Sequence, residues 1–224
     1  MDLIESHDLF MFDLDGLLVN TEELHYLSYK RMLERHGFHL LWDFETYFSI
    51  AQKDSEAVKH QILQLFPDVL KFASDWKDLY NQKKALLVEI LKENPVSLLP
   101  GAELFLHQLT EKQKKMCVVT HSTKEVVEVL RHKNPELETI PFWFCREDYK
   151  DPKPSPDGYL KAIEVLANES DAVVGFEDSF RGMQALIQTR AKPVLINSFD
   201  HKMREQFHKE GLLTFSSFNE ILHK

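Results

Sequence analysis

Short apolar runs alternate with amphipathic segments along most of this chain. The first run, residues 9–12, lies between Asp8 and Asp13 and predicts a short buried strand. Beyond residue 101 the alternation continues with predicted strands at 116–120, 142–145, 172–176 and 193–196, separated by predicted helices at 102–109, 124–132, 156–167 and 180–189. This order is typical of a doubly wound parallel sheet, so we expect a Rossmann-like α/β core with three layers (α/β/α).

A long helical stretch interrupts this alternation directly after the first strand. Residues 22–35 have apolar positions at helical spacing, with Thr21 as a possible N-cap and Gly37 as a stop. Residues 43–94 show two further helical stripes and no strand-like run, and the turn-rich segment 94–101 ends the pattern. We therefore predict a helical domain of residues 21–94 inserted into a core of residues 1–20 and 95–224.

Composition narrows the class of protein. The 224 residues are 43% hydrophobic, and 36 acidic against 27 basic residues give a net charge of -9, which argues against nucleic acid or anionic membrane as partners. No segment approaches the roughly 20 apolar residues of a membrane span. Cys117 and Cys145 lie in strand-like runs, which predicts buried reduced thiols. We expect a cytoplasmic protein that is a monomer or a weak dimer.

Two carboxylates, Asp13 and Asp15, follow the first strand one residue apart and precede Gly16. Buried carboxylates this close repel each other unless a cation or a proton lies between them, which indicates a divalent metal, an acid/base pair, or both. An Asx-type turn after a strand would give the same spacing, so this motif alone leaves both interpretations open.

Other polar residues follow the later strands. Thr120 ends the second strand, Glu177 and Asp178 follow the fourth, and Lys153 stands between two prolines before the third helix of this half. Ligands of open α/β sheets bind beyond the carboxyl ends of the strands. This set suits phosphoryl transfer, in which a carboxylate attacks phosphorus, a lysine and a divalent cation neutralise the oxygens, and a second carboxyl group protonates the leaving group.

Each of these residues also has an ordinary structural interpretation. Lys153 could be a solvent-facing lysine in a turn, and Ser179 could cap a helix behind an acidic loop. The segment Ser122-Thr123-Lys124-Glu125 matches a capping box, which favours Ser122 as a helix cap. Placing Glu177 and Asp178 near the first carboxylate pair without a cation would be costly, and this favours the functional interpretation.

The combined motifs resemble a known family. Asp13-Leu14-Asp15-Gly16, Thr120, Lys153-Pro154 and Glu177-Asp178-Ser179-Phe180-Arg181-Gly182 are similar to the four motifs of the haloacid dehalogenase superfamily, in the same order. The helical insert after the first motif resembles the cap of its β-phosphoglucomutase and phosphoglycolate phosphatase-like subfamily.

The resemblance implies a role for each motif residue. Asp13 would be the nucleophile that becomes an aspartyl phosphate, and Asp15 the general acid/base. Thr120 and Lys153 would bind the phosphoryl group; His121 would either line this site or lie at the surface. Magnesium would be held by the Asp13 carboxylate, the Asp15 backbone carbonyl and Asp178, with Glu177 as a ligand or a nearby partner.

The resemblance also sorts the possible reactions. Family dehalogenases lack a carboxylate at the position of Asp15, so dehalogenation is not expected. His25 matches a cap histidine of the mutases, but Phe48 and Gln52 stand where the mutases carry cations, and Lys53 is the only nearby substitute. We therefore predict a magnesium-dependent phosphatase of small phosphorylated metabolites. A sugar-phosphate mutase and a non-catalytic phosphate-binding protein are the alternatives.

Overall fold

The chain divides into two compact units in the computed structural model, which describes residues 2–51 and 56–223. One unit, called the core unit below, comprises residues 1–20 and 96–224; the other, the helical unit, comprises residues 21–95.

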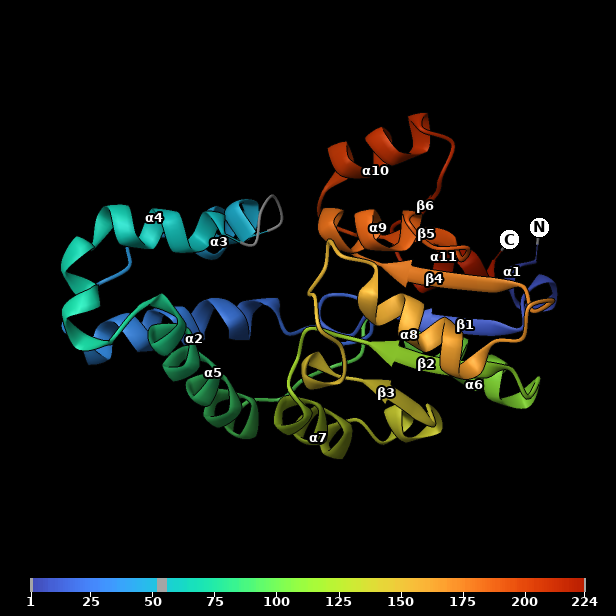
Figure 1. Ribbon diagram of the computed structural model, residues 1–224, viewed down its shortest axis with the longest axis horizontal. Coiled ribbons are helices and arrows are strands. Elements are labelled where there is room, and N and C mark those ends of the chain that lie inside the picture. The colour runs from blue at the N-terminus through green and yellow to red at the C-terminus, as the bar shows by residue number, and fades with distance from the viewer. Residues whose placement is uncertain (1, 52–55, 224) are drawn as a thin grey trace. The chain divides into compact units, whose positions relative to one another are not determined.

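The described part of the core unit is built on one six-stranded sheet in the order β3-β2-β1-β4-β5-β6. Every neighbouring pair is parallel, and the strand arrows β1, β2 and β4 point the same way in Figure 1. This topology confirms the predicted doubly wound sheet, whereas the short edge strand β6 was not predicted. The strands are β1 (Leu9–Phe12), β2 (Lys115–Val119), β3 (Phe142–Phe144), β4 (Val173–Glu177), β5 (Lys192–Ile196) and β6 (Leu213–Phe215).

Helices connect and flank these strands. The four predicted helices of this half are present with shifts of one or two residues at their ends. Helices α1, α10 and α11 and two 3₁₀ turns were not predicted. The helices are α1 (Leu3–Ser6), α6 (Ala102–Glu111), α7 (Lys124–Lys133), α8 (Asp157–Leu166), α9 (Phe180–Ile187), α10 (His201–Lys209) and α11 (Phe218–Leu222), with 3₁₀ turns η2 (Pro135–Thr139) and η3 (Arg146–Asp148).

Strand β1 is buried on both faces of the sheet. Successive side chains of a strand point to opposite faces, so Leu9 and Met11 join one apolar cluster with residues of α8 and α9. Phe10 and Phe12 face the other side, where their rings contact Phe105 of α6. All four β1 side chains are fully buried. The central strand that carries the first carboxylate motif is therefore held rigidly between two helical layers.

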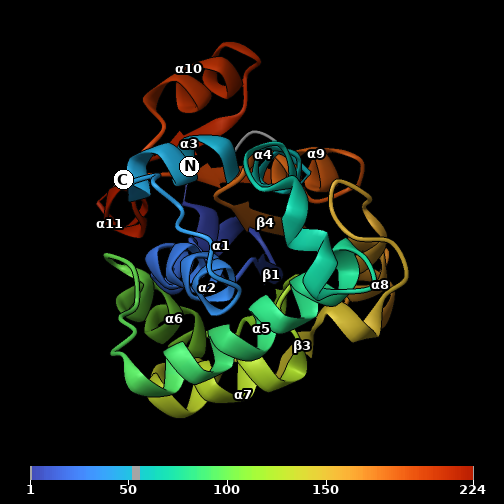
Figure 2. The same cartoon turned by 90° about the vertical axis from the view of Figure 1, so that its left-hand side faces the viewer.

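The helical unit contains α2 (Glu22–Arg35), α3 (Phe44–Ala51), α4 (Ala57–Leu65) and α5 (Trp76–Glu93), with a 3₁₀ turn η1 (Pro67–Phe72). Its described residues contain no strand. Helices α2 and α5 pack against each other (Figure 2), and Leu33, Ile62 and Leu79 are among the fully buried residues of its own apolar core. As predicted, helix α2 ends before Gly37, which has a positive φ of 80°.

The segment that follows β1 is tied to the core unit by its backbone. Gly16, with φ of 80°, donates its N–H to the carbonyl of Val19 at 2.9 Å. Val19 in turn forms an antiparallel bridge with Leu98, so the chain leaves and re-enters the core unit through two paired segments. This pairing fixes the loop that carries Asp15.

Both cysteines are buried and unpaired, as predicted. Burial raises the pKa of the Cys145 thiol to about 11 and that of Cys117 further, so both stay protonated.

Within residues 2–51 and 56–223, no helix combines the length and the apolar character needed to cross a bilayer.

Replacing Phe105 by alanine should destabilise the core unit strongly. Its ring is fully buried between Phe10, Phe12, Phe176 and Phe218, so its loss removes apolar contacts and leaves a cavity. We expect the free energy of unfolding, measured by urea denaturation, to fall by about 3–5 kcal/mol.

The adjacent Leu104 supplies a matched control, because its side chain is 51% exposed on the same helix. Leu104→Ala should cost less than about 1 kcal/mol. Equal losses for the two variants would contradict this account of the aromatic cluster.

Candidate active site

The register of two central strands sets the first carboxylates side by side. Phe12 of β1 pairs with Phe176 of β4, and the next residues along the two strands are Asp13 and Glu177. The Asp13 N–H donates to the Phe176 carbonyl at 3.1 Å, which continues the ladder past the end of β1. Backbone pairing alone therefore brings together two acidic residues that lie far apart in the sequence.

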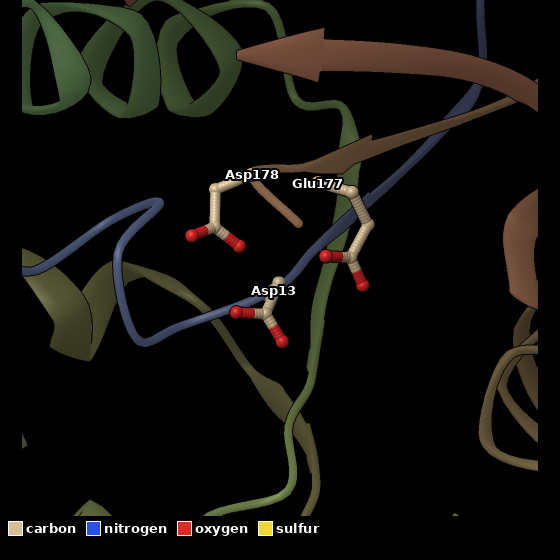
Figure 3. Close-up of side chains that lie close together, drawn as sticks. All are labelled: Asp13, Glu177 and Asp178. Atoms are coloured by element: carbon tan, nitrogen blue, oxygen red, sulfur yellow. The ribbon is translucent and has the colours of Figure 1, made fainter. Parts of the chain in front are cut away.

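Three carboxyl groups form one cluster at the carboxyl ends of β1 and β4. Asp13, Glu177 and Asp178 each offer an oxygen, and these oxygens lie within 4.8 Å of one another (Figure 3). The residues are 8%, 0% and 5% exposed. Glu177 and Asp178 are therefore not part of a solvent-exposed acidic loop.

Lys153 lies inside the same cluster. Its Nζ forms an ion pair with Asp13 Oδ1, lies 2.6 Å from Glu177 Oε1 and donates to the Val119 carbonyl at 2.9 Å. These three acceptors match the three N–H bonds of an ammonium group. Lys153 is 6% exposed, so its interpretation as a solvent-facing turn residue is wrong.

The electrostatics of the cluster favour an additional cation. Burial raises the pKa of Asp13 to about 7, and Glu177 adds to this, although the ammonium of Lys153 opposes it. Burial also disfavours the charged form of Lys153, yet Asp13 and Glu177 outweigh it and raise its pKa above the usual range. One ammonium does not balance three buried carboxylates. Carboxylate oxygens are the ligands that hard divalent cations such as Mg²⁺ prefer, so the donor set fits such an ion.

Asp15 is held by residues that follow β2. Ser122 Oγ donates to Asp15 Oδ2 at 2.7 Å, and Thr120 Oγ1 lies 3.5 Å from the same oxygen. The predicted capping box is therefore wrong, because the N-cap of α7 is Thr123 and the Ser122 hydroxyl is engaged by Asp15. The Thr120 hydroxyl also accepts the Ser122 N–H at 2.9 Å, so the three polar side chains form one connected group.

His121 supports the lysine loop. Its Nε2 accepts the backbone N–H of Lys153 at 2.7 Å, so this nitrogen is unprotonated. Burial, together with the positive charges of Lys153, Arg181 and Arg146, holds the pKa of His121 well below its usual value. The half-buried imidazole therefore enters the site as a neutral group that positions the Lys153 backbone.

The start of α9 encloses Glu177. Ser179 caps this helix by accepting the Gly182 N–H at 3.2 Å, as its structural interpretation predicts. A Cβ added to Gly182 would lie 1.9 Å from Glu177 Oε2. Glycine is therefore required here, because any side chain would displace the buried carboxylate.

The residues expected to act from the helical unit are only partly described. His25 lies on α2, and its Nδ1 is 2.9 Å from Nζ of Lys83 on α5. Phe48 lies on α3 and packs against the apolar core of the helical unit. Gln52 and Lys53 lie outside the described residues.

Two buried polar residues were missed by sequence reasoning. Lys83 is 2% exposed within the helical unit, and Tyr159 on α8 is fully buried with its hydroxyl 2.5 Å from Glu177 Oε1. Both occupy positions in the apolar stripes of their helices. Lys83 lies four residues after the buried Leu79, and Tyr159 lies three residues before the buried Ala162. A polar group at such a position needs a buried partner, and this was the available signal.

Comparison with known proteins agrees with this architecture. A phosphorylated carbohydrates phosphatase from Thermotoga maritima is 28% identical over 177 residues, 78% of each chain. A β-phosphoglucomutase from Mycobacterium bovis is 27% identical over 197 residues, 78% of this chain and 75% of its own. The crystal structure of CbbY from Rhodobacter sphaeroides in complex with phosphate has a similar fold, with a TM-score of 0.77 at 23% identity over 96% of both chains.

The family is shown by a match to a family profile. The sequence profile of the haloacid dehalogenase-like hydrolases matches residues 10–196, a stretch that begins in β1 and ends with β5. It includes every motif residue of the buried cluster described above. This chain therefore belongs to the haloacid dehalogenase-like hydrolase family.

Proposed function

We propose that this protein is a magnesium-dependent phosphatase of small phosphorylated carbohydrates that acts through an aspartyl phosphate on Asp13. The observation that carries the proposal is the buried pairing of Asp13 with Lys153 inside a cluster of three carboxylates. An ammonium held against a carboxylate in this way can neutralise phosphoryl oxygens while the carboxylate attacks phosphorus.

Asp13 would act as the nucleophile. Its carboxylate oxygen forms a bond to phosphorus while the bond from phosphorus to the ester oxygen breaks, and Lys153 offsets the charge on the phosphoryl oxygens. Lys153 already uses its three N–H bonds on Asp13, Glu177 and the Val119 carbonyl. It must therefore transfer at least one of them to the incoming phosphoryl group.

Asp15 would carry the proton. In its protonated form it donates to the departing ester oxygen, and in its ionised form it takes a proton from the water that hydrolyses the aspartyl phosphate. Ser122 and Thr120 lie on the same oxygen, Oδ2, and restrict the orientation of this carboxyl group. The two reactive carboxyl groups thus have different environments, which suits their different roles.

The metal would be held by Asp13 and Asp178. Glu177 already holds Lys153, so we assign it as the counter-ion of that lysine. A bound magnesium ion would neutralise phosphoryl oxygens and orient the group for in-line attack.

The substrate class rests on relatives. The Thermotoga relative is named for phosphorylated carbohydrates, and a sugar phosphate would present the phosphoryl group that this cluster can hold.

A sugar-phosphate mutase is the second candidate. The buried Lys83 beside His25 supplies a cation within the helical unit, and one relative is a β-phosphoglucomutase. A mutase would convert a sugar 1-phosphate to its 6-phosphate when a bisphosphate primer is added, without net release of phosphate.

Asp13→Asn should abolish phosphate release from a panel of sugar phosphates, phosphoglycolate and an aryl phosphate. An amide cannot serve as the nucleophile, so we expect kcat to fall by about 10³-fold or more. Wild-type activity should disappear with EDTA and return with MgCl₂ in a phosphate-release assay.

Asp171→Asn is the matched control, because Asp171 lies just before β4, at the amino ends of the strands, and pairs with Lys115. Its kcat should stay within about twofold of wild type. Metal-independent release, or equal activity of Asp13→Asn and wild type, would contradict the proposal. Isomerisation without phosphate release would favour the mutase.

Ser122→Ala should lower kcat by about tenfold, because it removes a hydrogen bond to the ionised form of Asp15 and loosens its orientation. Steady-state kinetics on the best substrate of the panel would measure this effect. Thr123→Ala changes the neighbouring hydroxyl, which makes no capping bond, and should leave kcat nearly unchanged. A Ser122→Ala variant with wild-type kcat would remove Ser122 from the mechanism.

A further inference from the structure

The hydroxyl of Tyr159 lies next to the ion pair of Glu177 and Lys153. It donates to Glu177 Oε1 at 2.5 Å, and Lys153 Nζ lies 2.6 Å from the same oxygen. The ammonium is also 5.0 Å from the centre of the Tyr159 ring. One carboxylate oxygen thus accepts from a neutral phenol and a cation at once.

Close packing of α8 holds the phenol in this place. A Cβ on Gly158 would lie 2.9 Å from Val119 Cγ1 of β2, so the first turn of α8 approaches the strand more closely than a larger residue allows. Tyr159, the next residue, is fully buried. Its hydroxyl therefore has a fixed direction.

Glu177 has little freedom to move away from Lys153. Its other oxygen, Oε2, faces Gly182, where even a methyl group would overlap with it, and the residue is fully buried. Asp13, the other carboxylate on Lys153, loses its negative charge when it carries a phosphoryl group. The strength with which Glu177 binds Lys153 therefore sets how well the ammonium can serve the phosphoryl oxygens.

We propose that Tyr159 is a positioning residue for Lys153: its hydroxyl satisfies part of the charge of Glu177, so that Lys153 remains shared with Asp13 and available to phosphate. Without this hydroxyl, Glu177 would draw Lys153 toward itself and away from the phosphoryl position. This inference rests on the proposed function, in which Lys153 binds the phosphoryl group.

Tyr159→Phe tests the inference, because it keeps the ring and removes only the hydroxyl. Orthophosphate binding, measured by calorimetry in the presence of MgCl₂, requires no turnover. We expect the dissociation constant to rise about tenfold, as for loss of a hydrogen bond to a charged group. Tyr26→Phe is the matched control, because Tyr26 donates to the Trp42 carbonyl within the helical unit. It should change orthophosphate binding by less than about twofold.

A double-mutant cycle separates positioning from general stability. In a Glu177→Gln background the carboxylate charge is absent, so adding Tyr159→Phe should change the dissociation constant by less than about twofold. A Tyr159→Phe protein that melts at a lower temperature but binds orthophosphate as wild type does would overturn the inference. So would an equal loss of binding in both backgrounds, or a wild-type protein that binds no orthophosphate.

Failure of the inference about Tyr159 can be distinguished from failure of the proposed phosphatase function. A wild-type protein that binds orthophosphate but hydrolyses no ester would refute the phosphatase, while the response to Tyr159→Phe would still decide the role of the phenol.

Discussion

Three carboxylates and one ammonium group share a space that water hardly reaches, and the core unit is arranged around this charge cluster. Burying a charge is costly unless it is paired and hydrogen-bonded, and Lys153 meets this need for Asp13 and Glu177 together. Removing the lysine would leave adjacent carboxylates without their shared partner. The apolar layers on both sides of β1 hold these groups together against their mutual repulsion.

The ends of the central strands position Asp13 and Glu177, and loops supply Asp15, Lys153 and the Ser122 hydroxyl. Asp13 and Glu177 are attached to neighbouring strands, whereas Lys153 arrives on a loop 140 residues further along the chain than Asp13. That loop is anchored through its backbone, since His121 accepts the Lys153 N–H and Gln188 donates to the Pro154 carbonyl at 2.9 Å. These two hydrogen bonds fix the backbone of the loop and therefore the position from which the Lys153 side chain extends.

Much of the fold could be predicted because the central strands are buried on both faces and appear as uninterrupted apolar runs. The edge strand β6 is only three residues long, and helix α10 has only Met203 and Phe207 as apolar residues, so periodicity gives little signal for either element. Ligands of open α/β sheets bind beyond the carboxyl ends of the strands, and this rule also drew attention to Asp13, Lys153 and Asp178. It could not decide the partner of Ser122, since a helix cap and a bond to Asp15 from 107 residues away use the same hydroxyl.

Tyr159 marks the limit of such reasoning. A tyrosine in the apolar stripe of a helix is ordinary in sequence, and only the close packing of α8 against β2 shows which buried atom its hydroxyl contacts. Contacts of this kind depend on the packing of elements distant in sequence, and local patterns do not contain them.

The pairing of β1 with β4 has a consequence for how this site can change in evolution. Asp13 and Glu177 are neighbours because the two strands are aligned residue for residue up to their ends. A single inserted or deleted residue in either strand would turn the following side chains to the opposite face and separate the carboxylates, even if the sheet still formed. Apolar side chains within these strands can exchange for others of similar volume. The lengths of the strands, in contrast, are as strictly constrained as the two carboxyl groups themselves.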